Sequence, residues 1–112
     1  MRYLGGKKKI GEEIAEVLKK YAPPGSVNGY IEPFCGCLSI TIHMVDDYKV
    51  SVSDIQKDLI ILWKETKSGT FKYPKDVSKK TWLRYKTQPP SAMRAFIGFG
   101  CSFGGKWFST YA

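Results

Sequence analysis

The chain has 112 residues, of which 43% are hydrophobic and 25% are charged, and its formal net charge is +8. This composition is typical of one modest globular domain, or of part of a larger one, and excludes a disordered or collagen-like chain. The longest apolar run, about six residues, is too short to span a membrane, and the first residues lack the apolar stretch of a signal peptide. We therefore expect a cytoplasmic protein with no membrane association.

Hydrophobic periodicity and turn signals predict alternating helices and strands in the first 68 residues. In chain order they predict a helix over 8–21, a strand over 30–34, a helix over 37–46, a strand over 50–53 and a helix over 55–66. The helix over 37–46 is inferred from the flanking turn and the strand that follows, because its own apolar residues alternate like those of a strand. Alternation of this kind implies an α/β fold with a parallel sheet and helices on its faces.

The remaining residues are predicted to be helical with intervening loops. A loop is expected over 69–75, helices over 76–87 and 92–99 with a break at Gln88-Pro89-Pro90, and a turn-rich, glycine-containing segment over 98–105. Residues 71–112 carry eight basic groups and one acidic group, interleaved with aromatic residues. This pattern suits a nucleic acid partner, although a solvated basic face with aromatic residues in the core explains it equally well.

The chain offers few groups for metal binding or for nucleophilic catalysis. It has three cysteines, Cys35, Cys37 and Cys101, and a single histidine, His43. An odd number of cysteines without a disulfide-like framework indicates reduced thiols. One histidine excludes a His-Cys zinc cluster and any mechanism that needs two histidines. We therefore expect no metal site.

Three short motifs stand in an order that favours an adenosine-bearing cofactor. They are Tyr3-Leu4-Gly5-Gly6-Lys7, then Glu32-Pro33-Phe34-Cys35-Gly36 at the end of the first predicted strand, and Asp54 at the end of the second. Ligands of open parallel sheets bind beyond the carboxyl ends of the strands. There, an acidic residue can accept hydrogen bonds from both ribose hydroxyls, and a glycine lets the backbone approach the ligand.

The glycine spacing narrows the choice of cofactor. The turn at Gly36 does not match the dinucleotide fingerprint, and the segment around Gly5-Gly6-Lys7 does not match the phosphate-binding P-loop. Both mismatches disfavour an oxidoreductase with a phosphate-bearing cofactor. S-adenosylmethionine has no phosphates, and Glu32 could face its cationic part while Lys7 faces its carboxylate. A strand, a glycine turn, a second strand and an aspartate nevertheless occur in many folds.

The three motifs together resemble those of Dam-type DNA adenine methyltransferases. The second extends to Glu32-Pro33-Phe34-Cys35-Gly36-Cys37-Leu38-Ser39, as in phage members, and the third is Ser53-Asp54-Ile55-Gln56-Lys57-Asp58-Leu59-Ile60. The resemblance implies a partial Rossmann-like methyltransferase fold, with an S-adenosylmethionine-binding part over 1–68 and the start of a helical DNA target-recognition region over 69–112. The cofactor-binding residues that it implies are Tyr3, Lys7, Glu32, Phe34, Gly36, Asp54 and Ile55.

The same resemblance implies double-stranded DNA as a partner and a bacterial or virus-infected cell as the setting. Arg2 stands where the family places a DNA-facing basic residue, and Ser102, Lys106 and Trp107 are further candidates for DNA contact. Cys37 departs from the family by replacing a glycine of the cofactor loop, where it would crowd the cofactor slightly. The reaction implied is methyl transfer to the exocyclic amine of adenine.

The chain lacks the Asp-Pro-Pro-Tyr tetrapeptide with which amino-methyltransferases hold the flipped base. Gln88-Pro89-Pro90-Ser91 is a near match, but no apolar strand precedes it and Ser91 cannot stack on a base. The sequence therefore predicts a fragment, a truncated gene product, or one half of a split enzyme whose second polypeptide supplies the rest. The alternative is a truncated, catalytically inactive module that binds S-adenosylmethionine or nucleic acid.

Overall fold

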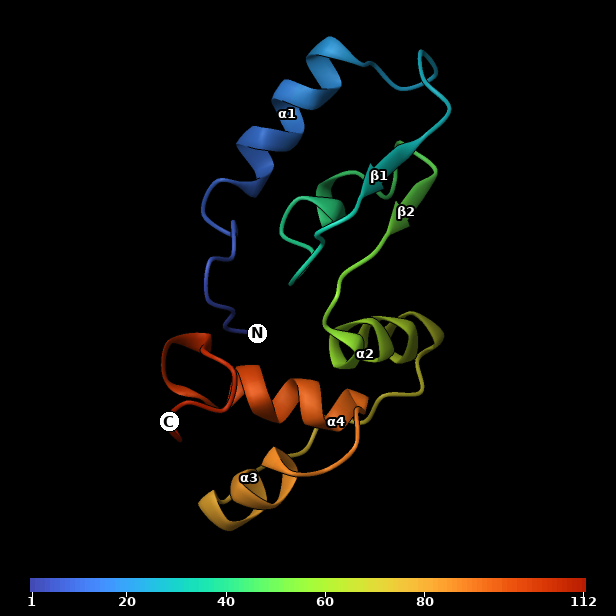
Figure 1. Ribbon diagram of the computed structural model, residues 1–112. Helices are drawn as coiled ribbons and strands as arrows, with labels where there is room; N and C mark the ends of the chain where they lie inside the picture. The colour runs from blue at the N-terminus through green and yellow to red at the C-terminus, as the bar shows by residue number, and fades with distance from the viewer. The chain divides into compact units, whose positions relative to one another are not determined.

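The computed structural model describes all 112 residues and divides them into two compact units. The α/β unit comprises Gly5–Ile55, and the helical unit comprises Met1–Leu4 together with Gln56–Ala112 (Figure 1). The first four residues thus belong to the same unit as the last residues of the chain. No helix in the structure combines the length and the apolar character needed to cross a bilayer.

The α/β unit contains two parallel strands, as the sequence predicts. Its elements are α1 (Gly11–Tyr21), β1 (Tyr30–Glu32), the 3-10 helix η1 (Thr41–His43) and β2 (Val50–Val52). β1 and β2 lie side by side in Figure 1 and pair in parallel, with Tyr30 opposite Val50 and Glu32 opposite Val52. The carboxyl ends of both strands therefore meet at one edge.

The position of α1 depends on a glycine at its first turn. Glu12 and Glu13 in the first turn and Lys19 and Lys20 in the last turn complement the helix dipole. Gly11 is buried, and a Cβ atom placed on it would lie 2.2 Å from the carbonyl oxygen of Ser39. The start of α1 therefore packs directly against the segment that follows β1.

The prediction of a helix over 37–46 is wrong, because only the single turn η1 forms there. Two residues before it adopt left-handed backbone conformations, Gly36 with a φ of 47° and Leu38 with a φ of 61°. Left-handed residues cannot continue a right-handed helix, so the segment turns tightly instead. The alternation of apolar residues, which resembles a strand, forms no strand either.

The helical unit is built from three short helices, each with a recognisable terminus. α2 spans Lys57–Ser68, α3 spans Lys79–Lys86, and α4 (Ala92–Ala95) continues through the π-helix η2 (Phe96–Gly100) before the short turn η3 (Phe103–Gly105). Gly69 ends α2 with a left-handed φ of 73°. Ser78 and Ser91 cap α3 and α4, because each hydroxyl accepts a backbone N–H three residues on.

Small residues let α2 and α4 pack closely in the core of this unit. Leu59 and Leu62 of α2 contact Ala92 and Ala95 of α4, and Phe99 completes the cluster. A second buried cluster contains Trp82, Ile97 and Phe108. Figure 1 shows α4 and η2 as one continuous helix, which contributes residues to both clusters.

The glycine-rich segment 98–105 is more ordered than the sequence suggests. Gly98–Gly100 form the last part of η2, and Gly98 is buried. A Cβ atom on Gly98 would lie 2.4 Å from the Trp107 ring, so this glycine serves aromatic packing rather than flexibility. The turn-rich expectation holds for the residues after Gly100.

Candidate cofactor and DNA sites

Two of the three predicted cofactor motifs, the segment after Glu32 and Asp54, meet at the carboxyl edge of the two strands. Pairing continues past the strand ends, since the Ser53 amide donates to the Glu32 carbonyl at 3.0 Å and the Cys35 amide donates to the Ser53 carbonyl at 3.0 Å. The segment after β1 and the residue after β2 are thereby held next to each other. This is the edge at which ligands of parallel sheets bind.

Asp54 and Gly36 are joined directly by a hydrogen bond. The backbone N–H of Gly36 donates to Oδ2 of Asp54 at 2.9 Å. The sequence predicted that these residues share a site, but not that the carboxylate holds the glycine loop. A carboxylate can accept about four hydrogen bonds, so Asp54 can hold the loop and still accept a ligand hydroxyl.

The loop after Gly36 is strained and tightly bonded. Leu38 is a non-glycine residue at a φ of 61°, a conformation that L-residues adopt at a cost of roughly 1–2 kcal/mol. The Leu38 amide donates to the Cys35 carbonyl at 2.8 Å, and Cys37 Sγ lies 3.0 Å from Ser39 Oγ. These hydrogen bonds hold the loop in its tight turn.

Glu32 is held by two hydroxyl groups that sequence reasoning missed. Its Oε2 accepts hydrogen bonds from Tyr30 at 2.9 Å and from Thr41. Burial, followed by the hydrogen bond to Glu32, raises the pKa of Tyr30 well above its ordinary value. Tyr30 therefore stays protonated at neutral pH, and the Tyr30 and Thr41 hydroxyls both donate to the Glu32 carboxylate at the strand edge.

The loop cysteine Cys35 is an inert thiol at neutral pH. It is buried, and burial together with the nearby Asp54 and Glu32 charges raises its pKa to about 11. A thiol of this kind is a poor nucleophile. No group of three or more His, Cys, Asp or Glu side chains is arranged to hold a metal ion.

The remaining predicted cofactor residues differ in their surroundings. Phe34 is 85% exposed and Ile55 is 95% exposed, so both apolar side chains have a face available for a ligand. Lys7 is exposed and donates to the carbonyl of Gly5 at 2.6 Å. Tyr3 belongs to the helical unit, where its ring lies 4.8 Å from that of Phe99.

The four predicted DNA contacts all lie in the helical unit but differ in exposure. Arg2 and Lys106 are exposed, and Trp107 is half-buried between Phe99 and Phe108. Ser102 is fully buried. Its hydroxyl accepts the Trp82 indole N–H at 3.0 Å and donates to the Gly98 carbonyl at 2.7 Å, so we leave it out of the DNA surface.

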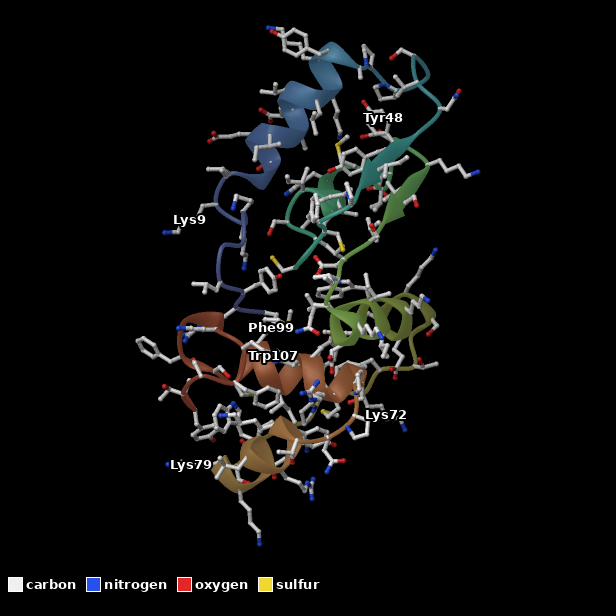
Figure 2. All side chains as sticks on the ribbon, viewed as in Figure 1. Lys9, Tyr48, Lys72, Lys79, Phe99 and Trp107 are labelled. Atoms are coloured by element: carbon white, nitrogen blue, oxygen red, sulfur yellow. The ribbon has the colours of Figure 1, made fainter.

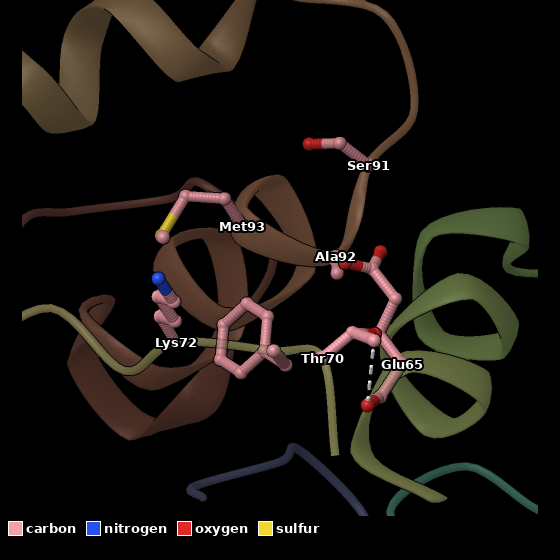
Figure 3. Close-up of a pocket in the computed structure, with 7 residues that line it drawn as sticks. Glu65, Thr70, Lys72, Ser91, Ala92 and Met93 are labelled. Carbon is pink, nitrogen blue, oxygen red and sulfur yellow. Dashed lines mark hydrogen bonds between the residues drawn. The ribbon is translucent and has the colours of Figure 1, made fainter. Parts of the chain in front are cut away.

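A shallow pocket of about 300 Å³ opens elsewhere in the helical unit (Figure 3). Its walls come from the end of α2, the loop after it and the start of α4: Glu65, Thr70, Phe71, Lys72, Ser91, Ala92 and Met93. None of the residues predicted to contact cofactor or DNA lines this pocket. It is therefore separate from the predicted site.

Comparison with known proteins gives a consistent result. Residues 3–91 match the model of the D12 class N6 adenine-specific DNA methyltransferases. Over 81 residues the chain is 32% identical to the Type II methyltransferase M.MjaIII of Methanocaldococcus jannaschii, which covers 70% of this chain and 28% of that protein. The chain thus spans less than a third of this relative, and no solved structure matches it. The resemblance inferred from the three motifs is confirmed: the chain belongs to the family of D12 class N6 adenine-specific DNA methyltransferases.

Proposed function

We propose that this chain binds S-adenosylmethionine and begins DNA recognition in the methylation of adenine at its exocyclic amine. The observation that carries the proposal is the hydrogen bond from the Gly36 amide to Asp54, which joins the segments that follow β1 and β2. In this proposal, β1 and β2 belong to a Rossmann-like sheet. Residues 1–68 form the cofactor-binding part, and residues 69–112 begin the recognition region.

The residues present fit the chemical groups of S-adenosylmethionine. Asp54 would accept the ribose hydroxyls, and the exposed side chains of Phe34 and Ile55 offer apolar faces to the adenine. Glu32 would balance the cationic part and Lys7 the carboxylate, and the Gly36 backbone would shape the pocket. The family resemblance adds Tyr3 as a cofactor contact. When bound, the cofactor supplies an electrophilic methyl group.

The fixed loop explains how these residues would act together. Gly36 is held by Asp54, and Glu32 is held by Tyr30 and Thr41. Groups that are already ordered lose little conformational entropy when a ligand binds. The chain's contribution to methyl transfer is therefore to bind and orient the cofactor.

For DNA, the proposal uses the exposed cations Arg2 and Lys106, together with Trp107, which follows Lys106 in the chain. Residues 71–112 add a net charge of +7, which suits the phosphate backbone of a duplex. The base-holding tetrapeptide is absent from the 112 residues, so we propose that a further segment or a second polypeptide supplies it. Since the proposed substrate is cellular or viral DNA, we place the protein in the cytoplasm and in a restriction-modification setting.

Calorimetric titration with S-adenosylmethionine tests the cofactor site. Asp54→Ala removes both the ribose acceptor and the anchor of Gly36, and should weaken binding by 100-fold or more, about 3 kcal/mol. Asp54→Asn keeps an acceptor for Gly36 but loses the charge, and should weaken binding by roughly 10-fold.

Asp46→Asn, an exposed charge change in the same unit, is the matched control and should bind like the wild type. Equal affinity of Asp54→Ala and the wild type would reject the ribose role. The reaction itself is tested with labelled cofactor and adenine-containing duplex. We expect methyl transfer only when a polypeptide that carries Asp-Pro-Pro-Tyr is added.

A further inference from the structure

The first four residues are docked onto the turn η3 near the other end of the chain. The Leu4 amide donates a hydrogen bond to the Gly105 carbonyl at 3.1 Å. The Tyr3 ring packs on Phe99 with 4.8 Å between ring centroids, and Phe99 in turn lies 4.6 Å from Trp107. Figure 2 shows Phe99 and Trp107 next to each other. Hydrogen bonding and ring packing therefore both hold residues 1–4 in place.

Gly105 is the residue that makes this docking possible. It is buried and has a φ of +67°. A Cβ atom at this position would lie 2.5 Å from the backbone nitrogen of Tyr3 and 2.6 Å from the carbonyl carbon of Arg2. Both neighbours are backbone atoms, which cannot rotate away as a side chain could. Any side chain at position 105 must therefore displace residues 2 and 3.

Gly104 has nearly the same backbone φ as Gly105 but lacks this contact. Its φ is +62°, so an alanine there meets the same backbone penalty. A Cβ atom at Gly104 would have no neighbour within 4 Å, however, and the residue is exposed. The two neighbouring glycines thus separate the effect of backbone strain from the effect of contact with the first residues.

We infer that Gly105 is a positioning residue that joins Arg2 and Lys106 into one DNA-binding surface. The inference rests on the proposed function, which assigns both cations to DNA. Gly105 contacts the Arg2 backbone and directly precedes Lys106, and both cationic side chains are exposed. The backbones of Arg2 and Lys106 are thereby brought close together, so that their charges can meet neighbouring phosphates. Loss of the docking releases Arg2 while Lys106 keeps its place.

The test measures affinity for a fluorescently labelled duplex of mixed sequence at several salt concentrations. Each phosphate contact contributes about 0.9 to the slope of log affinity against log salt. Arg2→Ala should lower the slope by about one and weaken binding roughly three- to ten-fold at physiological salt. Gly105→Ala should reproduce both changes, whereas Gly104→Ala should bind like the wild type.

A double mutant separates positioning from other effects of Gly105. If Gly105 acts through Arg2, the Arg2→Ala/Gly105→Ala protein should bind no more weakly than Arg2→Ala alone. Additive losses would overturn the inference, as would equal losses in Gly104→Ala and Gly105→Ala. Failure of the wild-type protein to bind any duplex would overturn the proposed function and the DNA surface together.

Hydrogen exchange of the Leu4 amide measures the docking of residues 1–4 on η3 in the absence of DNA. The amide should be protected in the wild type and in Gly104→Ala, and should exchange rapidly in Gly105→Ala. Leu4→Pro removes the donor without touching η3, so it provides the same test if Gly105→Ala fails to fold. It should lower the salt slope as Arg2→Ala does, and an unchanged slope would contradict the inference.

Discussion

The buried ion pair between Asp58 and Arg94 is the most informative site for a stability test. Asp58 on α2 is 2% exposed, and its two carboxylate oxygens lie 3.3 and 3.2 Å from Nη1 of Arg94 on α4. Asp58 also accepts the Ser91 amide at 3.1 Å. Arg94 donates further to the carbonyls of Tyr85 and Lys86 at the end of α3. One guanidinium therefore ties three helices together.

Removing only the Arg94 cation should destabilise the folded protein far more than removing both members of the ion pair. Arg94→Met leaves the Asp58 carboxylate buried with only the Ser91 amide in this network, and breaking a buried pair in this way costs about 3–5 kcal/mol. The guanidinium also lies 5.0 Å from the centre of the Trp107 ring, a contact worth roughly 0.5–1 kcal/mol. Arg94→Lys keeps a charge but loses the forked geometry, and should cost about 1–2 kcal/mol.

The double variant Asp58→Leu/Arg94→Met should recover most of this loss. Replacing a buried ion pair with apolar residues of similar size is often neutral or stabilising. We expect it to lie within about 1 kcal/mol of the wild type, which gives a coupling energy of at least roughly 2 kcal/mol. A double variant as unstable as the sum of the two single variants would refute this account of the network.

Urea denaturation followed by tryptophan fluorescence is the appropriate assay. Trp63, Trp82 and Trp107 all lie in the helical unit, so their fluorescence reports the unfolding of that unit. A shift of the midpoint with an unchanged slope would show that stability alone has changed. A cost below about 1 kcal/mol for Arg94→Met would mean that water solvates the carboxylate.

Three further changes test other parts of the structure. Ser102→Ala leaves the buried Trp82 indole N–H without its acceptor and should cost about 1–3 kcal/mol in the same fluorescence assay, whereas no loss would place water at the site. Between pH 9 and 11 the contribution of Cys35 to stability should fall by up to roughly 2–3 kcal/mol, because the folded protein keeps the Cys35 proton to a pKa of about 11 while the unfolded chain releases it near 9.0. Circular dichroism during urea denaturation should show a flatter pH dependence for Cys35→Ala, and an identical curve would contradict the raised pKa. Gly11→Ala should push α1 against the Ser39 carbonyl and weaken S-adenosylmethionine binding measured by calorimetry, and unchanged binding would separate α1 from the cofactor loop.

The predicted elements that survive are those whose local signals agree with their packing. α1 and α2 combine helical spacing of apolar residues with terminal charges or a glycine cap. The strands β1 and β2 form where they were expected, although β1 ends at Glu32, before Pro33. The prediction for the segment 37–46 was wrong because residues with left-handed backbone conformations determine its course, and hydrophobic periodicity does not report such conformations.

The candidate site shows the same division. The order of the motifs predicted that Asp54 and Gly36 share a strand edge, because the carboxyl ends of parallel strands coincide. It did not predict that Tyr30 and Thr41 hold Glu32, since hydroxyl groups at these positions carry no recognisable pattern. Ser102 was expected at a DNA surface because it lies in a basic, glycine-containing stretch, yet it is enclosed by Trp82 and Gly98.

Motif order and local periodicity can be read along the chain, and they were enough to predict the family, the parallel pairing and the meeting of Gly36 and Asp54 at the strand ends. The docking of residues 1–4 beside Gly105 and the joining of three helices by Arg94 are visible only in the folded chain. Both depend on contacts between residues far apart in sequence. Such contacts depend on packing and on buried hydrogen bonds, and no pattern of residues along the sequence reports them.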